Sequence, residues 1–189
     1  MKKAYLAAIL GVAFVGTAQA DTKVSYKTDV KEDVSADGTV KKSSAEETID
    51  AAGTKVKSSS DEKSKIKADG TRKASSTLSS TTDPKGLGNK TAAKREITSS
   101  EDGRGSFDRN TTATSVDAAG TAHKKVVERS VEQNADGTAK STFKEKVVND
   151  PKGLMNRSVE ETEREDKRDA NGNVIGDQLD KTVDGMKVN

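Results

Sequence analysis

Turn signals recur along this chain at nearly constant intervals, and this spacing restricts the fold more than any other feature of the sequence. Nine short segments contain a glycine together with aspartate, asparagine, alanine or proline. The interval between successive turn glycines is shortest from Gly38 to Gly53 and longest from Gly153 to Gly172. The segments are 36–39, 50–54, 68–71, 83–87, 101–104, 117–121, 135–138, 150–154 and 169–173. A random hydrophilic chain would not keep such a spacing, so it indicates a repeat structure.

A longer repeat is superimposed on the short one. Three turn segments recur at one fixed offset without a gap: 50–54 at 117–121, 68–71 at 135–138, and 83–87 at 150–154. Duplication of a four-segment unit is the simplest explanation. We therefore divide the chain into a signal peptide (1–20), an N-terminal hairpin region (21–49), a first four-segment repeat (50–116) and a second repeat with a C-terminal strand (117–189).

The turns alternate between two classes along the chain. Asp-Gly and Asn-Gly, which favour two-residue type I′ hairpin turns, alternate with Ala-Gly and Pro-Lys-Gly. If each segment between turns is one strand of about 12 residues, it is about 40 Å long. The sequence thus predicts an all-β fold, an antiparallel meander of about ten long strands with the Asp/Asn-Gly turns at one end. Large apolar residues are too sparse for two packed layers, so we expect a single layer, partly curled where the second half is more apolar.

Pairing across two-residue loops at Asp37-Gly38 and Ala52-Gly53 predicts a register. Val30 then lies opposite Ala45, Tyr26 opposite Ile49, Ile49 opposite Val56, and Thr39 opposite Ile66. The apolar residues that this register brings to one face are Val24, Tyr26, Val30, Val34, Ile49, Val56 and Ile66. The same pairing across Asp69-Gly70 places Leu78 on the other face, which requires a bulge or another register. A solenoid with one coil per turn interval and substantial disorder are the alternative interpretations.

The segment 1–20 has the features of a bacterial export signal. Lys2 and Lys3 precede an apolar stretch, 4–15, and an Ala-Gln-Ala cleavage site ends at Ala20. The apolar stretch is short for a membrane span. We expect a signal helix that is removed after Ala20, and a periplasmic or secreted mature chain without a transmembrane segment.

Charge and cysteine content exclude several classes of protein. The 33 Lys and Arg residues exceed the 31 Asp and Glu residues by two, and Lys2 and Lys3 of the signal peptide account for that difference. The mature chain has no basic excess, so nucleic acid is not an expected partner. Cysteine is absent, which excludes a disulfide framework.

Residues that could carry chemistry are few. His123 is the single histidine, and the carboxylates alternate with basic residues instead of lying in apolar surroundings that raise a pKa. We therefore expect neither an enzyme nor a cofactor. The one metal candidate is a weak calcium site in the segment 169–180, whose oxygen ligands follow EF-hand spacing but which has Val174 in place of the central glycine. Its ligands would be Asp169, Asn171, Asn173, Asp177 and Asp180.

These observations favour an exported, non-catalytic β-repeat protein with a structural, surface or matrix, or partner-binding role. The Lys- and Glu-rich segments resemble the single-layer sheets of some bacterial surface proteins. Cell-surface or matrix components, or further copies of the chain, would be the partners. The composition, with a mean hydropathy of −0.83, is also similar to that of hydrophilins, which implies a largely disordered periplasmic stress protectant as the alternative. Weak calcium or ligand binding at the Asp/Asn-Gly end is a second alternative.

Overall fold

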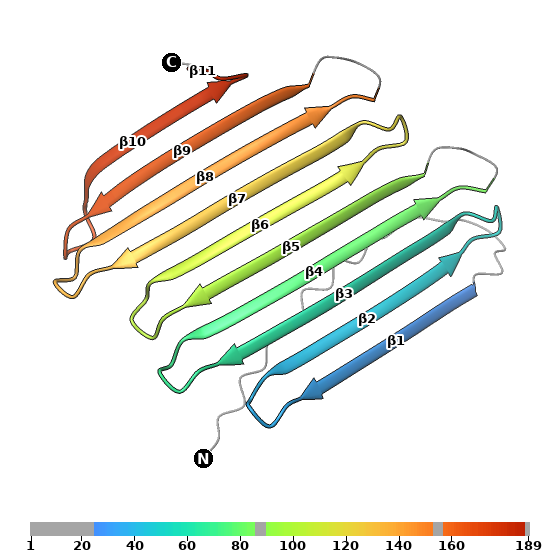
Figure 1. Ribbon diagram of the computed structural model, residues 1–189, viewed down its shortest axis with the longest axis horizontal. Coiled ribbons are helices and arrows are strands. Elements are labelled where there is room, and N and C mark those ends of the chain that lie inside the picture. The colour runs from blue at the N-terminus through green and yellow to red at the C-terminus, as the bar shows by residue number, and fades with distance from the viewer. Residues whose placement is uncertain (1–24, 86–89, 153–156, 188–189) are drawn as a thin grey trace.

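The computed structural model describes residues 25–85, 90–152 and 157–187, which form one antiparallel β-sheet (Figure 1). Each strand pairs with its neighbours in the sequence, so the sheet is a meander. The strands are β1 (Ser25–Val34), β2 (Val40–Ile49), β3 (Lys55–Ile66), β4 (Arg72–Asp83), β5 (Thr91–Glu101), β6 (Phe107–Val116), β7 (Ala122–Gln133), β8 (Ala139–Asp150), β9 (Ser158–Arg168), β10 (Val174–Val183) and β11 (Met186–Lys187). The expected meander of long strands is confirmed, with β11 as an additional short strand. The expected signal helix lies outside the described residues.

The sheet is an open single layer. Strands contact only their sequence neighbours, and the view in Figure 1 shows β1 and β10 at opposite sides of the sheet. Among the described residues no apolar side chain is buried, and Thr39, 5% exposed, is the one buried polar residue. The partial curling expected for the second half does not occur, because its apolar residues have no second layer to pack against.

The two classes of turn lie at opposite ends of the sheet, as the alternation predicts (Figure 1). The connections that follow β4 and β8, at 84–90 and 151–157, are seven residues long. These are the two Pro-Lys-Gly segments, so they form wider connections than the other turns. Lys85 and Lys152 from these connections lie over Gly53 and Gly120 of the adjacent turns, where an added Cβ would come within 2.6 and 2.7 Å of the lysine side chain.

The type I′ turns predicted at the five Asp/Asn-Gly positions are wrong. Seven hairpins, these five and the two Ala-Gly hairpins, share another kind of turn. Each of these has a five-residue loop whose fourth residue is a glycine with positive φ, and no other loop residue has positive φ. In the first of them the Gly38 amide donates to the Ser35 carbonyl at 2.9 Å and the Ser35 amide donates to the Thr39 carbonyl at 2.8 Å. This pattern is a type I turn followed by a glycine bulge. A two-residue loop with positive φ at both positions occurs at Asp184-Gly185, a turn that the sequence analysis did not identify.

The five-residue loops shift the register by one residue from the prediction. Val30 pairs with Ser44, Tyr26 with Thr48, and Ile49 with Lys55, so the predicted partners are wrong and Ile49 lies on the face opposite Val30. Thr39 is in a loop instead of pairing with Ile66. Leu78 pairs with Ser60, which places it on the same face as Val56 and Ile66 without a bulge. Val24 lies outside the described residues.

The long sequence repeat is visible in the strand bounds. The first and last residues of β2, β3 and β4 are separated from those of β6, β7 and β8 by the offset of the sequence repeat. The same offset separates the first and last residues of β6 from those of β10. The bulge glycines obey this offset too, with Gly38, Gly105 and Gly172 as one series. The glycine of the 102–106 loop that adopts positive φ is therefore Gly105, and not Gly103 as the dipeptide pattern indicated.

We expect Gly70→Ala to destabilise the sheet and Gly103→Ala to leave its stability nearly unchanged. Both sites have open space for a Cβ, but Gly70 has a φ of +83° whereas Gly103 has no positive φ. A left-handed alanine costs about 1 kcal/mol. Thermal unfolding followed by circular dichroism compares the two variants, and equal melting temperatures would contradict the assignment of the bulge position.

Candidate functional site: two unlike faces of one sheet

The sheet has two chemically different faces. Residues that pair directly across two strands lie on the same face. One face therefore carries the even-numbered residues of β1–β4 and β9 and the odd-numbered residues of β5–β8. In β10, the odd-numbered residues that follow the bulge at 174–176 lie on this face too. We call this the apolar face and the other the polar face. Large apolar residues of the apolar face are Val30, Val34, Val40, Val56, Ile66, Leu78, Ile97, Phe107, Val127, Val131, Phe143, Val147, Val174, Leu179 and Val183. Those of the polar face are Ile49, Val116, Val126, Val148 and Val159.

The apolar face is exposed to solvent. Val30 on β1 is 73% exposed, Ile66 on β3 is 64% exposed and Leu179 on β10 is 64% exposed. Arg129 extends over the ring of Phe143, with its guanidinium carbon 5.2 Å from the ring centroid, a cation–π arrangement. This face therefore combines uncovered apolar surface with cationic groups.

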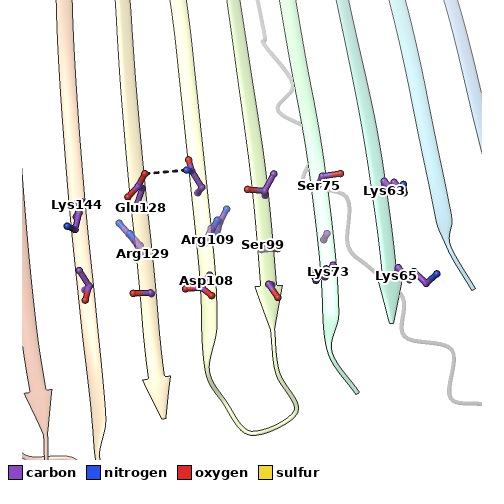
Figure 2. A pocket seen from close by; sticks show the side chains of 16 residues that line it. Lys63, Lys65, Lys73, Ser75, Ser99, Asp108, Arg109, Glu128, Arg129 and Lys144 are labelled. Atoms are coloured by element: carbon purple, nitrogen blue, oxygen red, sulfur yellow. Dashed lines mark hydrogen bonds between the residues drawn. The ribbon is translucent and has the colours of Figure 1, made fainter. Parts of the chain in front are cut away.

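The polar face carries a broad groove of about 690 Å³ that crosses β3 to β8. Figure 2 shows Lys63, Lys65 and Lys73 at one side of this groove and Lys144 at the other, with Asp108 and Glu128 between them. Glu128 accepts a hydrogen bond from the Asn110 amide at 3.5 Å. The lysines of the lining outnumber its carboxylates, although Lys65 and Lys144 pair with Asp37 and Glu163 outside the groove.

Ion pairs and hydroxyl pairs cross the strands on the polar face. Lys144 lies 2.8 Å from Glu163 and Lys140 lies 2.9 Å from Glu165, while the hydroxyls of Ser59 and Ser79 are 2.8 Å apart. Glu163 raises the pKa of Lys144, and Lys140 lowers the pKa of Glu165. Exposed pairs of this kind contribute little individually, but they join adjacent strands where no core exists.

Seven aspartates complete the five-residue turns, and the sequence analysis did not identify this role. A glycine bulge leaves the amide after the glycine without its ladder acceptor. In each of the seven loops an aspartate Oδ1 accepts a hydrogen bond from that amide, at 2.8 to 3.0 Å. The aspartates at the first loop position are Asp50, Asp102, Asp117 and Asp169, and those at the third position are Asp37, Asp69 and Asp136. In the sequence, an aspartate three residues or one residue before the turn glycine indicates a turn of this kind.

Hydrogen bonds from backbone amides and from side chains lower the pKa of six turn aspartates. The backbone amides of Thr71, Arg104 and Thr121 are the main cause for Asp69, Asp102 and Asp117 respectively. The main causes for the others are the hydrogen bonds from the side chains of Lys65 to Asp37, Thr138 to Asp136 and Asn173 to Asp169. In every case the charged carboxylate is the form that the turn stabilises.

The structure separates the residues of the calcium candidate. Asp169, Asn171 and Asn173 lie in the 169–173 turn, where Asp169 accepts hydrogen bonds from the backbone amides of both asparagines and from the Asn173 side chain. Asp177 and Asp180 lie in β10 on opposite faces, with Asp177 3.6 Å from Arg164 and Asp180 2.6 Å from Lys187. The segment is a turn followed by a strand, so it does not have the shape of an EF-hand loop.

His123 joins a turn to the adjacent strand. Its Nδ1 is 2.7 Å from Asn149 Oδ1 on β8, and its Nε2 is 3.7 Å from Asp117 Oδ2. Asp117 itself holds the 117–121 turn through the Thr121 amide. The histidine side chain is 43% exposed, and its contacts are those of a residue that positions a turn.

The described residues contain no metal-ligand cluster and no membrane-spanning helix. The described ranges contain no group of three or more His, Asp or Glu residues arranged to hold a metal ion. Within the same ranges no helix has the length and apolar character needed to cross a bilayer. Protein-family models, curated proteins and solved structures show no match to the chain.

Proposed function

We propose that this is an exported, non-catalytic β-repeat protein whose apolar face binds a partner that has both apolar and acidic groups. The observation that supports this proposal is the segregation of large apolar side chains to one exposed face of a sheet without a core. A sheet normally buries such a face against another layer. The partner supplies that layer, and the turns and ion pairs hold the sheet in shape before binding.

The size of the apolar face is sufficient for stable binding. Ten strands about 4.8 Å apart and about 36 Å long give a face of about 1,700 Å². A typical specific interface buries about 800 Å² on each partner. Half of the apolar face is therefore enough for a specific complex.

The charge of the apolar face indicates an acidic partner. Where β5, β6 and β7 cross this face, they carry Arg95, Arg109, Lys125 and Arg129 but only one carboxylate, Glu101. If the same region of a second copy packed on this one, the contact would hold the cations of both copies without enough carboxylates to neutralise them, and desolvating unpaired charges is costly. A partner with acidic groups removes that cost. No structural observation favours the stress-protectant or calcium-binding alternatives, so we do not propose them.

An apolar dye tests the exposed face directly. We expect the mature chain to increase the fluorescence of anilinonaphthalene sulfonate while it keeps its β circular dichroism spectrum. The double variant Leu78→Lys with Ile97→Lys interrupts the apolar face and should lower this signal several-fold, because it removes adjacent apolar groups. The control variant Thr77→Lys with Thr98→Lys adds the same charges to the polar face of the same strands. Equal dye binding by both variants would contradict the proposed binding face.

A further inference from the structure

A small hollow on the apolar face is rimmed by cations from three adjacent strands. Its floor consists of half-buried Thr111 and Ala113 on β6 and Val127 on β7, and its volume is about 370 Å³. The rim consists of the exposed side chains of Arg95 on β5, Arg109 on β6, and Lys125 and Arg129 on β7. We call these residues the basic hollow. Small floor residues between long cationic side chains leave room for a group that carries negative charge.

Most of the cationic charge in the basic hollow is not neutralised by the protein. Lys125 pairs with Glu145 at 2.8 Å, but among the described residues no carboxylate oxygen forms an ion pair with the guanidinium groups of Arg95, Arg109 or Arg129. Arg109 and Arg129 are direct partners across β6 and β7. Like charges in directly opposite positions destabilise a sheet, so the fold alone does not account for this pair.

The internal repeat provides a comparison within the same chain. The positions one repeat offset earlier in the chain that correspond to the four rim residues are Thr28, Lys42, Ser58 and Glu62, on β1, β2 and β3. They carry one positive and one negative charge, and Lys42 is already paired with Glu32 at 3.4 Å. The same strand geometry therefore forms without a cationic cluster. The basic hollow is not a requirement of the architecture.

Apolar side chains surround the basic hollow. Leu78 is the direct partner of Arg95 across β4 and β5, and Ile97 is the next residue of the apolar face along β5. On the other side, Phe143 is the direct partner of Arg129, and Val131 follows Arg129 on the same face. A ligand in the basic hollow would therefore contact the cationic rim with one of its groups and the surrounding apolar side chains with the rest of its surface.

We propose that the basic hollow binds the phosphate group of an acidic phospholipid, whose acyl chains cover the adjacent part of the apolar face. Arginine guanidinium groups donate paired hydrogen bonds to phosphate oxygens, and Arg109 and Arg129 are two such donors at directly opposite positions of β6 and β7. The Thr111 hydroxyl on the floor is a further donor. This inference rests on the proposed function, because it names the partner of the apolar face.

Vesicle sedimentation tests the lipid assignment. We expect the mature chain to sediment with vesicles of phosphatidylcholine and phosphatidic acid, and much less with phosphatidylcholine alone. The double variant Arg109→Gln with Arg129→Gln should bind about tenfold more weakly or worse, because it loses two charge-assisted donors. The control Lys94→Gln with Lys124→Gln removes the same charge from the polar face of β5 and β7. An equal loss in the control would overturn the proposal, since it would indicate non-specific attraction.

Two further measurements separate the possible causes of failure. Without lipid, the arginine variant should melt at or above the melting temperature of the wild type, because the substitutions remove a like-charge pair. If this folded variant binds vesicles normally, the basic hollow is not the binding site. Titration with inorganic phosphate measures binding of the free anion, and saturable phosphate binding without vesicle binding overturns the lipid assignment. If the dye binds the apolar face but neither phosphate nor vesicles bind, this inference fails while the proposed function stands. If the dye does not bind either, both fail.

Discussion

Acidification should unfold the sheet, with the loss beginning below about pH 4. The turn aspartates Asp69, Asp102 and Asp136 have lowered pKa values because their carboxylates accept hydrogen bonds from the turns. Their unfolded pKa is about 3.9. A group with a lowered folded pKa contributes stability that is present above its unfolded pKa and is lost as the pH falls through its folded pKa. We expect melting temperatures to be nearly constant from pH 7 to 5 and the β signal to be lost near pH 2.

Loss of ion pairs contributes to the same transition. Protonation of Glu165 leaves Lys140 without its partner, and the lysines and arginines remain charged and repel one another. Substituting the turn aspartates separates the two causes. Asparagine at Asp69 and Asp136 keeps a side-chain oxygen as an acceptor but does not titrate, so the transition should become shallower. Alanine removes the acceptor and should lower the melting temperature at pH 7 as well.

Circular dichroism melts between pH 2 and pH 7 provide this comparison. An Asp61→Asn variant is the control, because Asp61 is a strand carboxylate outside the turns. If the asparagine variants at Asp69 and Asp136 show the same pH dependence as the wild type and the control, the turns are not the source of acid sensitivity. Asparagine variants that melt as low as the alanine variants at neutral pH would show that the turns need the charge and not only the acceptor.

The strand order and the ends of the sheet could be predicted from the spacing of the turns. The register could not, because it depends on loop type. Asp37-Gly38 suggests a two-residue loop, but Asp37 instead accepts from the Thr39 amide inside a five-residue loop. A one-residue difference moves every side chain of a strand to the other face. This explains why the predicted register places Ile49 on the wrong face, and why Leu78 requires another register instead of a bulge.

The basic hollow could not be found from sequence spacing either. Its arginines, Arg95, Arg109 and Arg129, lie far apart in the sequence, and no local motif joins them. They share a face because five-residue loops connect β5 to β6 and β6 to β7. Loops of this length pair the odd-numbered residues of each strand with the odd-numbered residues of the next. The seven-residue connection at 84–90 then brings these odd-numbered positions beside the even-numbered apolar positions of β4, which include Leu78. Once the register is known, the alternation of side chains defines the face.

Excision of one complete repeat should leave a folded, shorter sheet. Gly38 and Gly105 occupy the same position in equivalent loops, so removal of 38–104 joins Asp37 to Gly105 and regenerates a five-residue turn. β1 then pairs with β6 in the register that β5 has with β6. Strands contact only their sequence neighbours, and a one-dimensional array of this kind loses nearest-neighbour interactions without losing its fold. We expect the same β signal per residue and a lower melting temperature.

A second excision, of 39–104, is the control because it leaves one extra residue in the new turn. Its loop contains both Gly38 and Gly105, and the register of β1 must either slip or be lost. Hydrogen exchange should therefore show protected β1 amides in the 38–104 variant and rapid exchange of the same amides in the 39–104 variant, while β7 and β8 are protected in both.

A 38–104 variant with the spectrum of a random coil would show that the sheet depends on contacts beyond adjacent strands. Equal protection of β1 in both variants would show that the turn does not set the register. One extra loop residue is expected to prevent the pairing of β1, because the aspartate and the glycine have fixed positions in the bulge turn.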